Sequence, residues 1–161
     1  SRAVSASDMS TARGQANHAI YLSRILLDAW HRDLGAQSTA APTLAQAYLP
    51  AIRRHLVEAY GWFLLEVTRP GSLPDQPPRC LADLPAIAEG KATPGEIREF
   101  ERLEESGWVA DMLGDDVGVG APASAGNLAV AAPAAGPEQA EHWVDQLQAL
   151  FDRMGDSLDE Y

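Results

Sequence analysis

The chain has 161 residues, of which 46% are hydrophobic and 22% charged, the composition of a globular domain large enough to bury a core. Twelve basic residues against 23 acidic ones give a formal net charge of -11. A field of that sign repels nucleic-acid phosphates and anionic lipid headgroups, so we expect no nucleic-acid partner and no attachment to a membrane.

The single cysteine, Cys80, excludes an intramolecular disulfide and a cluster of thiolate ligands. No stretch reaches the roughly 18 consecutive apolar residues of a membrane-spanning helix. The polar N-terminus also lacks the apolar segment of a signal peptide. We therefore expect a cytoplasmic protein of bacterial type.

Residues 1–9 are small and polar and predict a disordered segment ahead of a single helical domain over residues 10–161. A helical pattern begins at Ser10 or Thr11 and reaches Gly35. Apolar and small side chains recur on one face of this helix, which predicts that it packs on a core. That face carries Ala16, Ala19, Ile20, Ser23, Leu26, Leu27, Trp30 and Leu34.

The second predicted helix opens with a capping box, in which Thr43 and Gln46 satisfy backbone donors, and runs to about Val67. Pro50 lies inside it and should kink or reset the helix near Tyr48, because proline removes a backbone donor. A wheel of this helix predicts an apolar arc of about 160°. The arc consists of Ile52, Leu56, Val57, Tyr60, Phe63, Leu64 and Val67, is interrupted by Arg53, and leaves Gly61 beyond it, where another helix could approach closely.

Prolines and a glycine then predict a loop over residues 68–79, with a short helix over residues 81–89 after it. Thr93, Pro94 and Glu96 form a helix start signal, and the helix they open extends to Gly114 with an interruption expected at Ser106–Gly107. Residues 114–136 are Ala/Gly/Pro-rich and predict a mobile loop. A last helix starts at Pro137.

Together these elements predict an all-α protein, an antiparallel helical bundle of about four main helices with two irregular loops. No segment alternates like a strand. One tryptophan falls on each of the four main predicted helices, namely Trp30, Trp62, Trp108 and Trp143. We interpret them as parts of a shared core, although an aromatic ligand pocket could use the same arrangement.

A polar stripe follows the first helix opposite its core face, formed by Asn17, Tyr21, Arg24 and Asp28 at spacings of about one turn. Arg24 and Asp28 are placed to pair at i,i+4. The stripe is either a solvated face or a surface for a partner, since tyrosine and arginine are favoured in interfaces.

A second candidate lies on the second helix, where His55, Glu58, Trp62 and Glu66 are helical neighbours. They are either a solvated edge beside a half-buried tryptophan or the lining of a pocket. A bundle di-metal centre would need Glu-x-x-His motifs, and the chain has none. We therefore predict no metal and no cofactor.

The first helix resembles the opening helix of an uncharacterised family of small bacterial helical proteins, a domain of unknown function. The shared pattern is Asn-x-x-x-Tyr-x-x-Arg-x-Leu-Leu, matched by Asn17, Tyr21, Arg24, Leu26 and Leu27. Residues 103–113 resemble a later segment of the same family, although Gly107 separates Ser106 from Trp108. The resemblance covers about residues 12–113 and implies a helical fold with no assigned activity.

From these patterns we expect a non-enzymatic helical bundle that acts through protein–protein contacts, as a homodimer or with another protein partner. The homodimer is suggested by the apolar surface on residues 52–67, which is wide enough to pack on two sides. The alternative is a small-molecule or metal-binding bundle, or an enzyme, with a pocket around His55, Glu58, Trp62 and Glu66.

Overall fold

The computed structural model describes residues 11–68, 73–84, 94–114 and 136–159, and all the regular structure within these ranges is helical. The predicted all-α fold is confirmed. The N-terminal segment, the short helix beyond Leu84 and most of the Ala/Gly/Pro-rich segment lie outside the described residues. None of the helices in the described ranges is long and apolar enough to cross a membrane.

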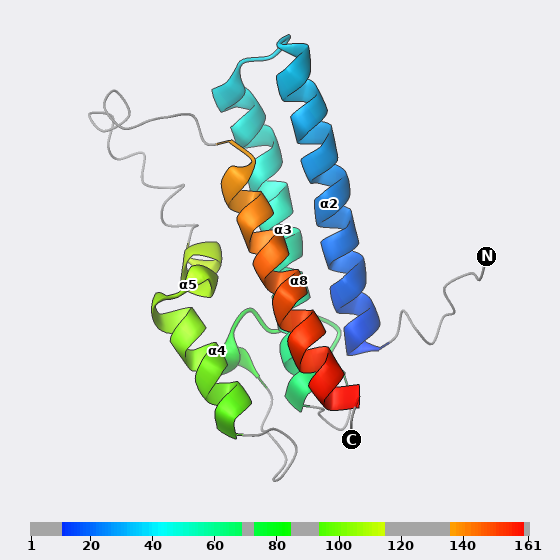
Figure 1. The fold of residues 1–161 in the computed structure, drawn as a ribbon, viewed down its shortest axis with the longest axis vertical. Helices are drawn as coiled ribbons and strands as arrows, with labels where there is room; N and C mark the ends of the chain where they lie inside the picture. Colours follow the sequence, from blue (N-terminus) through cyan, green and yellow to red (C-terminus); the bar gives the residue numbers. More distant parts are fainter. Residues whose placement is uncertain (1–10, 69–72, 85–93, 115–135, 160–161) are drawn as a thin grey trace, which may run out of the picture.

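Helix α2 (Ala12–Ala36) and helix α3 (Ala41–Thr68) form an antiparallel pair (Figure 1). Thr11 caps α2, because its Oγ1 accepts a hydrogen bond from the Gly14 amide at 2.9 Å. At the other end Gln37 adopts the left-handed conformation, with φ of 55°, and its amide bonds to the carbonyl of Leu34. The short connection of residues 37–40 forces the two helices to run in opposite directions.

The predicted capping box of the second helix is wrong, because α3 begins at Ala41, two residues before Thr43. Pro42 then falls in the first turn, where its missing amide would have no partner within the helix anyway. The prediction of a reset at Pro50 also fails, since α3 continues through this exposed proline.

The remaining elements are the short 3-10 helix η1 (Leu81–Asp83), α4 (Pro94–Ser106), α5 (Trp108–Leu113) and α8 (Glu138–Asp159). The interruption predicted at Ser106–Gly107 is confirmed, because Gly107 has an extended backbone and separates α4 from α5. Helix α8 runs antiparallel to α2 and packs on both α2 and α3, while α5 contacts α3 and α8 from the other side (Figure 1).

Helix α3 is the centre of the bundle. The apolar arc predicted for it is buried, and burial extends further round the helix to Ala59, Gly61, Leu65 and Thr68. The wide apolar surface that suggested a homodimer is therefore covered within the chain by α2, α5, α8 and the proline-rich segment.

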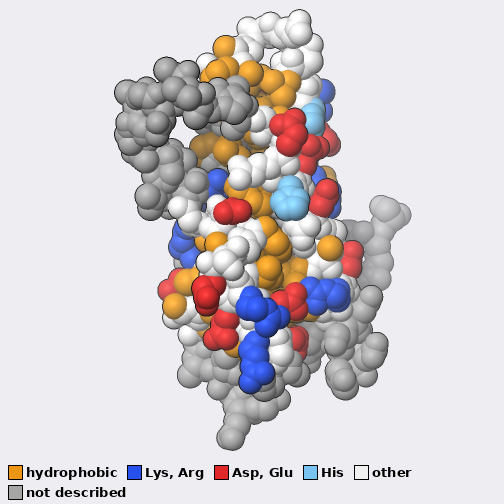
Figure 2. All heavy atoms as spheres, turned by 60° about the vertical axis from the view of Figure 1, so that its left-hand side comes forward, with side chains coloured by type: hydrophobic (Ala, Val, Ile, Leu, Met, Phe, Trp, Pro, Cys, Tyr) orange, Lys and Arg blue, Asp and Glu red, His pale blue; other side chains and the backbone are white. Residues whose placement is uncertain are grey.

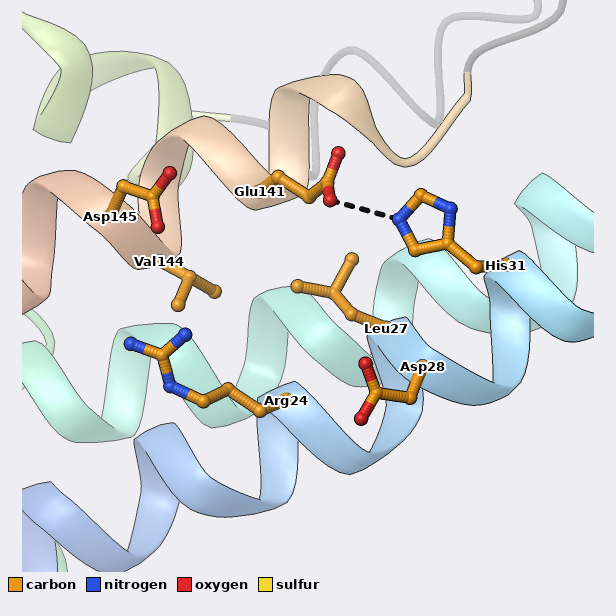
Figure 3. Close-up of a pocket in the computed structure, with 7 residues that line it drawn as sticks. All are labelled: Arg24, Leu27, Asp28, His31, Glu141, Val144 and Asp145. Atoms are coloured by element: carbon orange, nitrogen blue, oxygen red, sulfur yellow. Dashed lines mark hydrogen bonds and ion pairs between the residues drawn. The ribbon is translucent and has the colours of Figure 1, made fainter.

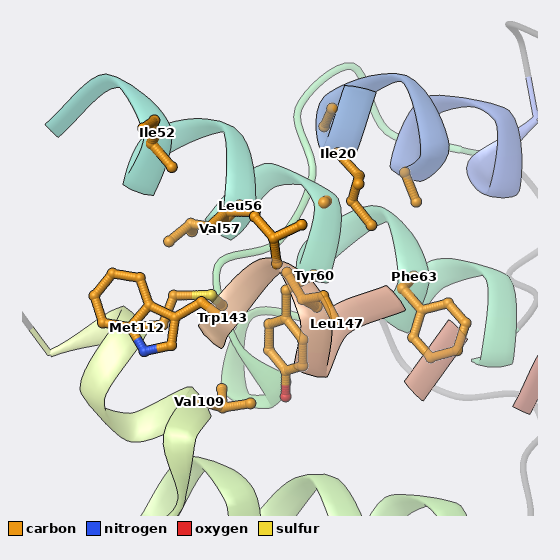
Figure 4. Close-up of a cluster of buried hydrophobic side chains, with 14 of the residues drawn as sticks. Ile20, Ile52, Leu56, Val57, Tyr60, Phe63, Val109, Met112, Trp143 and Leu147 are labelled. Carbon is orange, nitrogen blue, oxygen red and sulfur yellow. The ribbon is translucent and has the colours of Figure 1, made fainter. Parts of the chain in front are cut away.

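Aromatic rings join the helices inside the core (Figure 4). Phe63 of α3 stacks on Phe151 of α8 with ring centroids 4.2 Å apart, and Phe100 of α4 meets Phe63 edge-on at 6.2 Å. Trp30 and Trp143 are completely buried, as the shared-core interpretation predicts. Trp62 and Trp108 are half-buried at the edge of the same core.

Arg53 lies inside this core although it is charged. Its guanidinium sits over the Trp143 ring, 4.8 Å from the ring centre, and its Nη1 donates to the Met112 carbonyl at 3.4 Å. The carbonyl belongs to the last turn of α5, where carbonyls have no hydrogen-bond partner within the helix and the helix dipole has its negative end. Arg53 thus links three helices, so its interruption of the apolar arc reflects a structural role.

The proline-rich segment packs against the C-terminal half of α3. A Cβ atom built on Gly61 would lie 2.0 Å from the carbonyl oxygen of Pro78 and 3.0 Å from the Cβ of Pro77. The predicted close approach at Gly61 is therefore real, but its partner is a loop and not a helix. Beside it, the Glu104 carboxylate accepts hydrogen bonds from the Tyr60 hydroxyl at 2.5 Å and from the Leu81 amide at 2.9 Å. Burial, reinforced by this bond, raises the pKa of Tyr60 well above its ordinary value.

The molecular surface carries charges of both signs. On the face shown in Figure 2, Asp and Glu side chains lie close to Arg side chains beside a strip of hydrophobic ones. Ion pairs between helices contribute to this pattern. Arg153 of α8 contacts Glu99 of α4 at 2.6 and 3.1 Å, a bidentate geometry whose hydrogen bonds raise the pKa of Arg153.

We expect Gly61→Ala to lower the free energy of unfolding by about 1–3 kcal/mol, the usual cost of overpacking, because the backbone of Pro78 must move. Gly35→Ala is the matched control: nothing lies within 4 Å of its added methyl group, and the change should stabilise the helix by up to about 1 kcal/mol. Urea denaturation followed by circular dichroism measures both. Equal stabilities of the two variants would contradict the close packing of the loop on α3.

Candidate functional site

A cleft of about 180 Å³ opens between α2 and α8. Its base is apolar, because Leu27 of α2 and Val144 of α8 point toward one another between the two helices and are both buried (Figure 3). Charged side chains surround this base. The complete lining consists of Arg24, Leu27, Asp28, His31, Glu141, Val144 and Asp145.

Two polar contacts join the helices at the ends of the cleft. The His31 Nε2 atom lies 2.9 Å from a carboxylate oxygen of Glu141, and Arg24 donates from Nη2 to the Gln148 side-chain oxygen at 3.3 Å. Both contacts bridge α2 and α8 at the rim of the cleft. Within the described residues, Asp28 and Asp145 form no ion pair, and together with Glu141 they give the cleft three carboxylates against the single guanidinium of Arg24.

The predicted polar stripe is exposed on α2. Asn17, Tyr21, Arg24 and Asp28 all face outward, and Arg24 and Asp28 also line the cleft. The expected pairing of Arg24 with Asp28 is wrong, because the guanidinium reaches across to Gln148 on α8 instead. Ile25, which the sequence reasoning did not single out, completes this surface with 46% of it exposed, next to Tyr21 with 59%.

The four residues of the second candidate stay on the half-buried edge of α3 where the periodicity placed them. Glu58 lies 3.6 Å from the guanidinium of Arg54, and Glu66 lies 3.4 Å from that of Arg13 on α2. None of the four lines any of the three clefts that we characterise among the described residues. Trp62 packs against the core.

His55 is the most unusual of these four. Its side chain is only 26% exposed, and its Nδ1 atom lies 3.9 Å from Glu58, too far for a hydrogen bond. Burial lowers the pKa of His55, and Arg54 and His18 of α2 act in the same direction, while Glu58 opposes them. Burial therefore favours the neutral form of His55, because a charge at this position would be poorly solvated.

The geometry offers no site for a metal ion within the described ranges, where no group of three or more His, Cys, Asp or Glu side chains comes close enough to hold one. His31, Glu141 and Asp145 were missed by the sequence reasoning. These three residues come together because α2 and α8, which are far apart in the chain, pack on each other. No local spacing in the sequence indicates this contact.

Comparisons with protein-family models, with curated proteins and with solved structures returned no match to this chain. The resemblance of the first helix to an uncharacterised bacterial family stays a prediction.

The lowered pKa of His55 predicts how stability depends on pH. Because the unfolded chain takes up the proton more readily, stability is complete above the ordinary value of 6.5 and is lost as the pH falls below it. We expect the loss of unfolding free energy between about pH 7.5 and pH 5.5 to be smaller in His55→Gln than in the parent chain.

The control for this measurement is His142→Gln, which changes an exposed histidine on α8. Urea titrations at the two pH values give the required difference for each protein. An unchanged pH dependence in His55→Gln would show that burial of His55 does not influence its protonation.

Proposed function

We propose that this protein is a non-enzymatic helical bundle that works through protein–protein contacts made by the exposed face of α2. The contact face, as we use the term, consists of Asn17, Tyr21, Arg24, Ile25 and Asp28. The observation that carries the proposal is the exposure of Tyr21 and Ile25, two large side chains one turn apart on a helix whose buried face packs on α3 and α8.

The residue types of this face fit the proposal. Tyrosine and arginine are enriched where interfaces concentrate their binding energy. The helix that presents them is capped at both ends and packs on α3 and α8, so little ordering would be needed on binding. A reducing, cytoplasmic setting belongs to the same proposal, since the only cysteine, Cys80, carries a free thiol.

The partner can be a second copy of the chain or a different protein. The homodimer now depends on the contact face alone, because the apolar surface of residues 52–67 packs inside the chain. The alternative of a ligand pocket around His55, Glu58, Trp62 and Glu66 gains no specific support, since both carboxylates already face an arginine.

Site-specific photo-crosslinking tests this proposal. A benzophenone amino acid at position 21 should form an adduct in cells of the source organism, whereas the same amino acid at the exposed position of Arg98 on α4 should not. The mass of the adduct separates the two forms of the proposal, because a homodimer gives twice the mass of the chain. Equal yields at the two positions would contradict a role for the contact face.

A further inference from the structure

The α2–α8 cleft has the size of a side chain. Its volume of about 180 Å³ is below the range of roughly 300–1,000 Å³ that is typical of pockets for small molecules and cofactors. It lies directly beside the contact face, because Arg24 and Asp28 belong to both. A partner that covered Tyr21 and Ile25 would therefore be able to place one of its side chains in the cleft.

The chemistry of the cleft selects the kind of side chain. Its buried base of Leu27 and Val144 suits an aliphatic stem, since lysine and arginine bury their methylene groups while the charge stays at the rim. Asp28 and Asp145 stand on opposite helices at that rim without an ion-pair partner among the described residues. Arg24 and His31 are hydrogen-bonded to Gln148 and Glu141. The charge of Arg24 remains in the lining, but the three carboxylates there outnumber it.

We propose that the α2–α8 cleft receives a lysine or arginine side chain from a basic segment of a partner protein, while apolar residues of that segment cover Tyr21 and Ile25. This inference rests on the proposed function, because it names the partner chemistry of the contact face. The overall charge favours a different protein over a second copy. Two chains of -11 each repel one another, whereas a basic segment is attracted by the field.

The experiment uses short random peptides displayed against the whole chain. Enriched peptides should share one Lys or Arg flanked by apolar residues, and fluorescence anisotropy then gives the Kd of a labelled peptide. We expect Asp28→Asn with Asp145→Asn to weaken binding by about tenfold and to reduce its salt dependence. The control, Glu101→Gln with Asp111→Asn, removes the same charge from exposed positions on α4 and α5 and should leave the Kd unchanged.

A double-mutant cycle shows whether the peptide's cation enters the cleft. Replacing that Lys by norleucine should weaken binding to the parent chain by about tenfold but add little to the effect of the Asp28/Asp145 variant. Additive losses of binding would overturn the inference. It would also be overturned if the enriched peptides were acidic or uncharged, or if no peptide were enriched. Light scattering that shows a dimer formed through the same face would also overturn it, in favour of a second copy.

The failure of the inference can be told apart from the failure of the proposed function. Tyr21→Ala and Ile25→Ala remove the apolar part of the contact face without touching the cleft. If they weaken peptide binding and the aspartate variants do not, the contact face stands and only the basic side chain is wrong. If neither pair has an effect, both proposals fail.

Discussion

The burial of α3 on almost every side along residues 51–68 is the constraint on which the rest of the structure depends. A long helix with so little exposed surface must be covered by several elements at once. Helix α2 covers one side, α8 and α5 cover others, and Pro77 and Pro78 close the gap at Gly61. Each of these elements packs one face on α3, so only its outer face is available for contacts with other molecules.

Three buried polar side chains of this core each have a hydrogen-bond partner, namely Ser23, Thr68 and Arg53. Ser23 and Thr68 donate to the carbonyls of Ala19 and Leu64, one turn earlier in their own helices. Arg53 instead reaches across to the end of α5, and Glu104 accepts from both Tyr60 and Leu81. The contacts of Arg53 and Glu104 fix the relative position of the elements that they join, since they form only when these elements are correctly packed.

The proposed function follows from what the packing leaves uncovered. Because α2 packs on α3 and α8 through one side, Tyr21 and Ile25 remain outside together with the polar stripe. The cleft arises at the border of the same surface, where Leu27 and Val144 bring α2 and α8 together. An apolar and an acidic feature thus adjoin, which suits a partner with apolar and basic residues.

Helical periodicity by itself determined the all-α class, the buried faces of α2 and α3 and the exposed stripe of Asn17, Tyr21 and Arg24. The start signal formed by Thr93, Pro94 and Glu96 determined the start of α4. These features depend on residues a few positions apart, which a helix always brings together. Only the tertiary structure decided that Arg24 bonds to Gln148 instead of Asp28, that Pro78 fills the space above Gly61 and that His31 meets Glu141. Such contacts join segments far apart in the chain, and their formation depends on how the helices pack around α3, which no local spacing encodes.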